Sequence, residues 1–186
     1  MVDIPARKGR PVEIFRFHEM LGAPQVNGDV GRDWDVVEER IGCALPGDYK
    51  RFVSAYGPGC INEQLYIFHP RSVDDANGLL LDSLWSQAAY SYAELSQSSP
   101  DLYPYPVYPA VGGGFPVARS ISGNHVFLMP PGRPSADWYV VVEMGESIAI
   151  DASFTDFLWA ALVGELGVPV VEGEPSFERV GEVEAC

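Results

Sequence analysis

The stretch from Trp34 to Pro70 constrains the fold more than any other part of this chain. Trp34, Val37 and Ile41 recur at the spacing of one helical face, so this segment is predicted to be an amphipathic helix. Gly42 follows directly, at a position where helices commonly end in a left-handed residue. This region therefore begins with a short helix that buries one side against a core.

A second short helix is predicted immediately after the first. Leu45-Pro46 opens it, because proline is favoured at the first helical position, where the amide that it lacks has no helical partner. Gly57-Pro58-Gly59 ends it, and residues 65–68 then have the length and composition of a strand buried on both faces. The apolar stripe of this helix consists of Tyr49, Phe52, Val53 and Tyr56.

Three charged residues of the two helices carry specific expectations. Glu38 lies on the apolar face of the first helix, so its carboxylate should be half-buried and paired with backbone amides or an arginine. Asp48 falls in the first turn of the second helix, where a negative charge suits the helix dipole. Lys50 lies off the apolar stripe and should be solvated.

The two helices and the strand match a pattern that resembles the SUKH superfamily, W-x-x-V-E-x-x-I-G-x-x-L-P-x-D-Y-K-x-F-V-x-x-Y-G-x-G. This superfamily takes in bacterial immunity proteins against polymorphic toxins and a fungal regulator of cell-wall synthesis. Residues 114–118, 138–142 and 154–158 also resemble the family, so the likeness covers residues 33–166. One departure is the turn at residues 122–125, where many members carry an acidic hairpin and then a tryptophan. The motif positions are Trp34, Glu38, Leu45, Pro46, Asp48, Tyr49 and Gly57.

The predicted elements and the resemblance imply an α+β fold, in which a mostly antiparallel, twisted sheet of five to six strands carries helices on one face. The other face would be partly open and available to a partner. We expect a partly ordered N-terminal extension over residues 1–32, in which residues 12–17 fit either a strand or a helical turn. A SUKH-like domain over 33–166 and a mobile acidic tail over 167–186 follow. Residues 168–171 are the candidate for a short docked segment within the tail. Six glutamates from Glu165 to Glu184 against one arginine, interrupted by prolines and glycines, indicate the tail.

The composition is strongly acidic, with a formal net charge of −14 and an isoelectric point near 4.4. Binding of nucleic acid through its phosphates needs a basic surface, so this charge argues against a nucleic-acid partner. An acidic protein attracts basic partners, and salt screens this attraction. The alternative is that the acidity serves solubility alone.

We expect partner-binding side chains in two surface groups. The first is acidic and would attract a basic partner. The second is a segment in which tyrosines and prolines alternate, and tyrosine is favoured at interfaces because it offers a large contact area. The alternative for the tyrosines is an extended connector whose rings lean on the core. The candidate residues are Asp35, Glu39, Asp74, Asp75, Asp101, Tyr103, Tyr105 and Tyr108.

We find no sequence pattern that indicates catalysis, a metal or a cofactor. The histidines are isolated, and none lies at a metal-ligand spacing. The three cysteines form no C-x-x-C pair, so a reducing compartment is the simplest assumption. We therefore expect neither an enzyme nor a cofactor. The remaining alternative is a small-molecule pocket lined by Tyr66, His69 and Trp85.

The resemblance implies a cytoplasmic immunity protein that binds and neutralises a bacterial toxin, typically a nuclease domain. Its acidic surface would occlude the basic active-site cleft and mimic the phosphates that such a toxin binds. The alternative is an intracellular scaffold or regulator that binds other host proteins, as the fungal branch suggests. We expect neither a secretory signal nor a membrane span, because no long apolar stretch is visible. Both a monomer and a dimer are compatible with the sequence.

Overall fold

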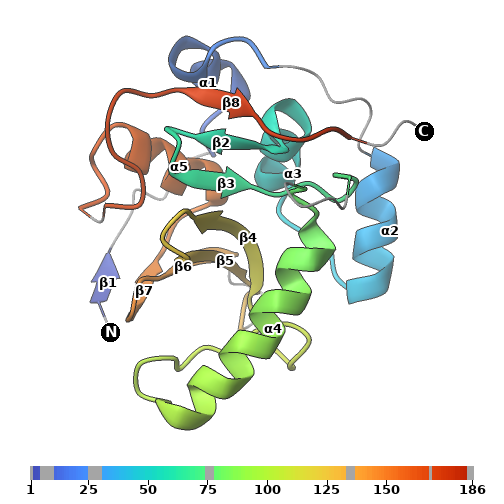
Figure 1. Cartoon of the computed structure of the whole chain (residues 1–186), viewed down its shortest axis with the longest axis vertical. Coiled ribbons are helices and arrows are strands. Elements are labelled where there is room, and N and C mark those ends of the chain that lie inside the picture. The colour runs from blue at the N-terminus through green and yellow to red at the C-terminus, as the bar shows by residue number, and fades with distance from the viewer. Residues whose placement is uncertain are drawn as a thin grey trace.

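The computed structural model describes residues 2–4, 11–24, 31–73, 78–132, 137–167 and 169–183. Within these ranges an eight-stranded sheet forms the centre of the molecule (Figure 1). Neighbouring strands pair antiparallel except β1, which lies parallel to β7. Across the sheet the order is β1 (Val2–Ile4), β7 (Ser147–Ile150), β6 (Tyr139–Glu143), β5 (His125–Met129), β4 (Phe115–Ser120), β3 (Leu65–Ile67), β2 (Gly59–Ile61) and β8 (Phe177–Arg179).

The α+β class and the mostly antiparallel sheet are confirmed. The sheet has eight strands instead of five or six, because each end of the chain adds one strand at an edge. The six strands between them, β2 to β7, all come from the segment predicted to form the domain. The two additional strands are three residues each, too short to produce an alternation that could be read from sequence.

Five helices pack around the sheet in the described part of the chain. The helices predicted after Asp33 and Leu45 are present, as are the long helix before the central strands and the short one after them. The segment that fitted either a strand or a helical turn is a helix. The bounds are α1 (Ile14–Leu21), α2 (Gly31–Ile41), α3 (Gly47–Tyr56), α4 (Leu81–Ser98) and α5 (Phe154–Leu162).

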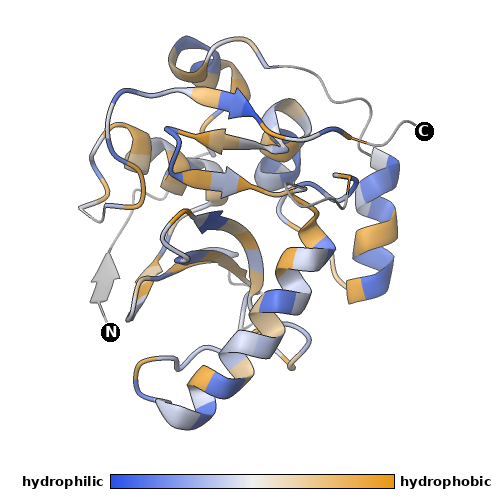
Figure 2. Ribbon diagram, in the orientation of Figure 1, coloured by the Kyte–Doolittle hydropathy of each residue, from blue (hydrophilic) through white to orange (hydrophobic). Residues whose placement is uncertain are grey.

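An aromatic core joins α1, α3 and α5 to one face of the sheet. Phe52 of α3 is fully buried at its centre. The rings of Phe17 and Phe154 contact it, with centroids 5.1 Å and 5.7 Å from the centroid of Phe52. In Figure 2 hydrophobic and hydrophilic residues alternate along α2, as expected for a helix that buries one face.

The other face of the sheet is covered by α4 over β5 and β6. Ala88 and Tyr92 of α4 pack against Phe127, Met129 and Val141. We expected this face to be partly open to a partner. It is covered because apolar side chains project from both faces of the central strands, and each set requires burial.

The segment after residue 169 docks on the domain. Docking was expected only for residues 168–171, so the expectation of a mobile tail is wrong for residues 172–183. Val170 and Val171 are buried, and β8 pairs with β2 at the edge of the sheet. Asn62 anchors the approach to β8, because its side-chain oxygen accepts a hydrogen bond from the Ser176 amide at 2.8 Å. Ring contact between Tyr56 and Phe177, at a centroid distance of 5.3 Å, holds β8 against α3.

Two motif residues link the helices of the domain. The rings of Trp34 and Tyr49 meet edge to face at a centroid distance of 5.4 Å, which packs α2 against α3. Asp48 is buried and accepts hydrogen bonds from the Thr155 amide at 2.9 Å and the Thr155 hydroxyl at 3.2 Å. Asp48 therefore caps the first turn of α5 across the core, in addition to its favourable place in its own helix.

Glu38 is half-buried and paired, as its position predicted. Its Oε1 accepts from the Leu45 amide at 2.8 Å and contacts Lys50 Nζ at 2.5 Å. Lys50 was expected to be solvated, but it is drawn into this ion pair because the buried carboxylate requires a cation as well as an amide. Gly57 directly follows α3, as the sequence indicated, whereas Pro46 is the N-cap residue, one position before its expected place in the first turn.

Substitution of Gly59 should displace β8. A Cβ atom at Gly59 would lie 2.1 Å from Phe177 Cζ and 2.7 Å from the backbone oxygen of Glu178. We expect Gly59→Ala to lower the free energy of unfolding by about 1–3 kcal/mol, because the adjacent strand must move. Denaturant titration measures this loss. Gly132→Ala is the control, since no atom of the described residues lies within 4 Å of the added methyl group. An equal loss in both variants would contradict the close approach of β8.

Candidate functional site

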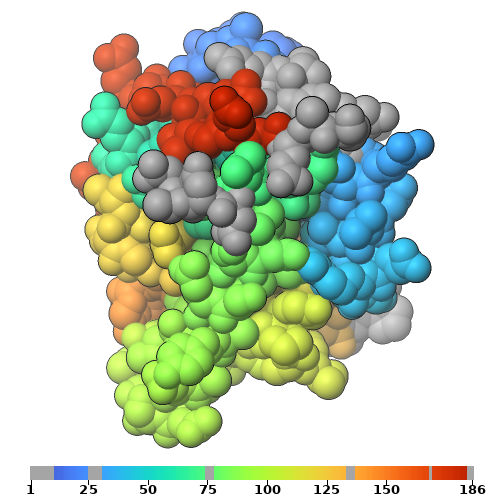
Figure 3. All heavy atoms as spheres, turned by 45° about the vertical axis from the view of Figure 1, so that its right-hand side comes forward, coloured from blue at the N-terminus to red at the C-terminus, as the bar shows by residue number. Residues whose placement is uncertain are grey.

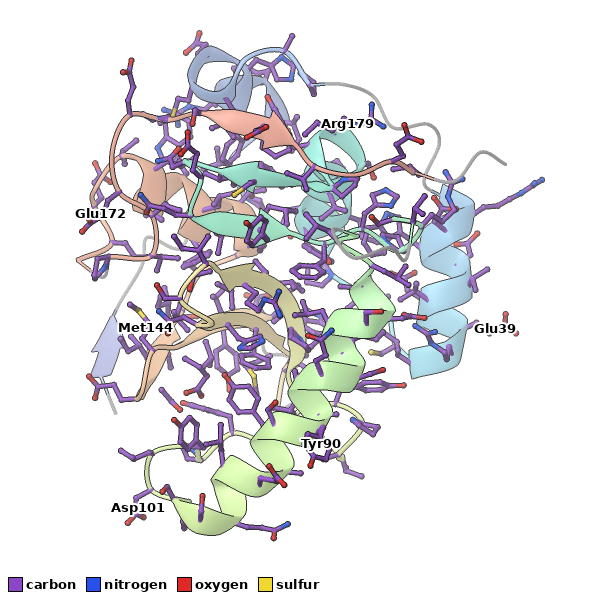
Figure 4. All side chains as sticks on the ribbon, viewed as in Figure 1. Glu39, Tyr90, Asp101, Met144, Glu172 and Arg179 are labelled. Carbon is purple, nitrogen blue, oxygen red and sulfur yellow. The ribbon has the colours of Figure 1, made fainter. Side chains whose placement is uncertain are left out.

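The predicted acidic residues within the described ranges are exposed but do not form one cluster. Asp35 and Glu39 lie on α2, and Asp101 lies in the loop after α4. Figure 4 shows Glu39 and Asp101 on opposite sides of the view. Asp74 and Asp75 fall outside the described residues. The surface acids therefore have to be considered as separate groups.

An ion pair joins the end of α2 to the first turn of α4. Arg40 donates two hydrogen bonds of 2.5 Å to the carboxylate of Asp82, and these bonds raise the pKa of Arg40. Since α4 has 18 residues, it is about 27 Å long. The acids of α2 therefore lie near the first end of α4, whereas Asp101 lies beyond its last turn.

The tyrosines of the proline-rich segment pack against the core, as the connector interpretation expects. Tyr108 stacks on Phe115 at a centroid distance of 5.0 Å. Tyr103 contacts Tyr92 of α4 at 5.9 Å, and Tyr105 packs against the same cluster. All three are half-buried, so they are not a freely exposed strip.

A cavity of about 250 Å³ lies between the second half of α4 and the turn that joins β4 to β5, and we call it the α4 pocket. Figure 3 shows α4 and the loop that follows it side by side at the molecular surface. His125 and Glu143 are direct partners across β5 and β6, so both project from the face that α4 covers. The lining includes Tyr92, Leu95, Tyr103, Asn124, His125 and Glu143.

Glu143 is a buried carboxylate, and only one of its two oxygens is hydrogen-bonded. Its side chain is only 4% exposed, Oε1 bonds the Ser147 hydroxyl, and Oε2 has no hydrogen-bond partner in the described part of the chain. The Ser147 hydroxyl also lies 3.0 Å from the Leu102 carbonyl, so a single proton is shared between two acceptors. Burial raises the pKa of Glu143, and the bond from Ser147 opposes the rise. An added donor would relieve this arrangement.

His125 and Tyr92 form the polar wall beside Glu143. The Tyr92 hydroxyl and His125 Nδ1 are 3.3 Å apart. Burial lowers the pKa of His125 to about 4, with the charge of Arg119 as a smaller cause, so the imidazole is neutral at neutral pH. Burial also raises the pKa of Tyr92. Because His125 bonds Tyr92 while Glu143 bonds Ser147, these side chains form no relay of the kind that activates a nucleophile.

The chain around the α4 pocket carries acidic residues, and it also carries Arg119, the cross-strand partner of His125. Glu94, Asp101 and Glu146 are exposed, and each lies within two residues of a side chain that lines the pocket. Exposed apolar residues flank them, with Leu102 at 48% and Ile121 at 61% exposure. We call these five residues the α4 surface. The segments that contain no lysine or arginine are residues 81–114, 120–132 and 137–147.

A second polar cluster, at the start of α2, is structural. Arg71 Nε lies 2.6 Å from the buried carboxylate of Asp33, and the Arg71 amide donates to His69 Nδ1 at 3.1 Å. His69 is completely buried, and burial lowers its pKa to about 4. The alternative of a small-molecule pocket lined by Tyr66, His69 and Trp85 finds no support in the described cavity that Trp85 lines, because that cavity includes neither Tyr66 nor His69.

Another polar cavity of the described residues is also structural. A cavity of about 300 Å³ has four aspartates in its lining, but Asp48 caps α5 and Asp156 bonds the Val12 amide and Ser153. Within the described ranges, no group of three or more histidine, cysteine, aspartate or glutamate side chains is arranged to hold a metal ion. Among the same residues, we find no helix with both the length and the apolar character needed to cross a membrane.

Sequence reasoning missed the α4 pocket, although one signal for it was present. Glu143 ends a strand whose three preceding residues are valines, and a carboxylate in such a run is unusual. His125 and Tyr92 give no comparable signal, because the fold brings them to Glu143 from other elements. No protein-family model, no curated protein and no solved structure matches this chain, so the resemblance to the SUKH superfamily rests on the sequence pattern.

Proposed function

We propose that this chain is a non-catalytic, SUKH-type protein-binding domain, an immunity protein that binds and neutralises a bacterial toxin of the nuclease type. The observation that supports the proposal is the α4 surface, where exposed acids lie beside a pocket and residues 81–114, 120–132 and 137–147 contain no lysine or arginine, although Arg119 lies opposite His125. A nuclease cleft is basic because it binds phosphates, so the two surfaces are complementary in charge. Seating the domain over the cleft excludes nucleic acid sterically.

The α4 surface also has the composition of an interface. Leu102 and Ile121 supply exposed apolar contact beside the acids Glu94, Asp101 and Glu146. Stable interfaces combine an apolar centre with a polar rim and bury about 800 Å² on each partner. The length of α4, about 27 Å, suits a patch of this size. Asp35 and Glu39 then add long-range attraction from the neighbouring helix.

Charge reversal on the α4 surface should abolish capture of the partner. The α4-surface variant carries Glu94→Lys, Asp101→Lys and Glu146→Lys. We expect tagged wild-type protein to retain one basic protein from a lysate of its own source in low salt, and the variant to lose it. Mass spectrometry identifies the bound protein, and a nuclease assay with and without the domain tests whether it is neutralised. The variant should lose the partner because like charges then face each other across the interface.

A remote variant of equal net charge provides the control. Glu19→Lys, Glu165→Lys and Glu174→Lys change exposed residues of α1 and of the segments that follow α5. This variant should retain the partner. Equal loss from both variants would show that total charge, and not the α4 surface, governs binding. Capture of several unrelated host proteins by the wild type would favour the scaffold or regulator over the immunity protein.

A further inference from the structure

We propose that the α4 pocket receives the guanidinium group of one arginine side chain of the partner protein, with the unbonded Oε2 of Glu143 as its main acceptor. This inference rests on the proposed function, since the arginine belongs to a protein partner. It adds a specific anchor to an attraction that surface charge alone would leave diffuse. Arginine is enriched among the few residues that dominate interface energies, especially where its head is desolvated.

The acceptor is already in place before any ligand arrives. Glu143 is 4% exposed, and its Oε2 lacks a hydrogen-bond partner in the described part of the chain. A buried oxygen of this kind costs free energy in the unbound protein. A donor from outside removes that cost and gains a charge-assisted hydrogen bond. The pocket is therefore adapted to a cation more than to a neutral or anionic group.

The remaining walls suit a flat, multiply donating cation. The rings of Tyr92 and Tyr103 meet edge to face at the pocket wall, and aromatic rings attract guanidinium groups. His125 is hydrogen-bonded to Tyr92 and neutral at neutral pH, because burial lowers its pKa to about 4. A neutral imidazole does not repel an incoming cation. The volume of about 250 Å³ admits one such side-chain head and excludes a large ligand.

The titratable groups near Glu143 come from several elements. His125 lies on β5, Tyr92 on α4 and Tyr103 in the following loop. His125 and Tyr92 are neutral at neutral pH, because burial lowers the pKa of His125 and raises the pKa of Tyr92. Arg119 of β4 is the cation whose charge reaches His125. Its guanidinium bonds Gln87 at 3.1 Å and lies over the ring of Phe68, and Arg119 does not line the pocket. The site for an incoming cation is thus not filled by this residue.

Glu143→Gln tests whether the Glu143 carboxylate serves to bind a cation or only to stabilise the fold. The probe is n-butylguanidinium, and n-butylurea is its neutral analogue. We expect the probe to shift the amide resonances of Gly123, Asn124 and Gly145 saturably, and the urea to shift none of them. Glu143→Gln should weaken probe binding at least about tenfold, because the charge-assisted bond is lost. Glu146→Gln, the same change on the exposed rim, should keep probe affinity within about twofold.

The thermal midpoint gives a second measurement. Glu143→Gln should weaken binding of the probe, but it should not lower the stability of the folded protein. Because the folded pKa of Glu143 is raised, its ionised form disfavours the folded state at a pH above the unfolded value and not below it. The thermal midpoint of Glu143→Gln should therefore equal that of the wild type at low pH. At mildly alkaline pH it should be no lower than that of the wild type, and up to about 2 °C higher. His125 contributes equally to both proteins and cancels in this comparison.

The following results decide the inference. Saturable binding of the cation alone, lost in Glu143→Gln but kept in Glu146→Gln, supports it. Equal resonance shifts with the urea, or no shifts with the cation, overturn it. A lower thermal midpoint of Glu143→Gln at every pH makes Glu143 a structural residue and also overturns it. If the cation binds while wild-type protein captures no basic partner, the pocket stands and the proposed function falls. If the cation does not bind while the α4-surface variant loses its partner, the pocket inference falls and the proposed function stands.

Discussion

Phe52→Ala is expected to lower the free energy of unfolding by about 3–5 kcal/mol, the largest effect of any single substitution considered for this protein. Phe52 is completely buried, and its ring contacts Phe17, Tyr56 and Phe154. Alanine would leave a cavity at the point where α1, α3 and α5 meet, and surrounding rings cannot all move to fill it. The measurement is a denaturant titration followed by circular dichroism.

Phe15→Ala is the matched control for this substitution. Phe15 also lies on a helix, α1, but its side chain is 64% exposed. We expect its removal to change the free energy of unfolding by no more than about 0.5 kcal/mol. Similar losses in the two variants, or a loss under about 1 kcal/mol for Phe52→Ala, would show that the aromatic core is not packed as described.

Removal of residues 167–186 is expected to lower the free energy of unfolding by about 4 kcal/mol. Val170 and Val171 are buried, and complete burial of each valine is worth about 1.5–3 kcal/mol. The deletion also removes β8 from the edge of the sheet and the ring of Phe177 from Tyr56. A mobile acidic tail would instead leave stability unchanged when removed. Denaturant titration of the shortened chain distinguishes these two outcomes.

The role of charge in this segment is tested separately. Glu172→Gln, Glu174→Gln and Glu182→Gln together remove three exposed charges from the full-length chain and keep its apolar contacts. We expect the triple variant to unfold within about 0.5 kcal/mol of the wild type. If the triple variant lost as much stability as the shortened chain, charge and not packing would hold the segment in place.

Helical periodicity was sufficient to predict most of the fold. The apolar spacing around Trp34 and Phe52 placed α2 and α3, and runs of apolar residues placed β3, β5 and β6 after them. β8 could not be found in this way. It is a Phe-Glu-Arg tripeptide within an acidic segment, and it becomes a strand only because β2, more than a hundred residues earlier in the chain, offers a free edge.

The candidate site could be predicted only in part. Asp101 and Tyr103 were identified from sequence, and the structure places Asp101 beside the α4 pocket and Tyr103 in its lining. The pocket itself depends on register. His125 meets Glu143 only because β5 and β6 pair as they do, and α4 closes the site by placing Tyr92 over His125. A shift of one residue would turn both side chains to the other face.

The central claim, electrostatic recognition of a basic protein by the α4 surface, is tested most directly by one kinetic measurement. The quantity is the association rate constant of the captured partner, measured for wild type and the α4-surface variant at ionic strengths of about 0.01 M and about 0.15 M. The account predicts that the wild-type rate falls at least about tenfold with added salt, and that the variant is already slow in low salt. Equal rates for the two proteins at low salt, or a wild-type rate that does not respond to salt, would contradict it.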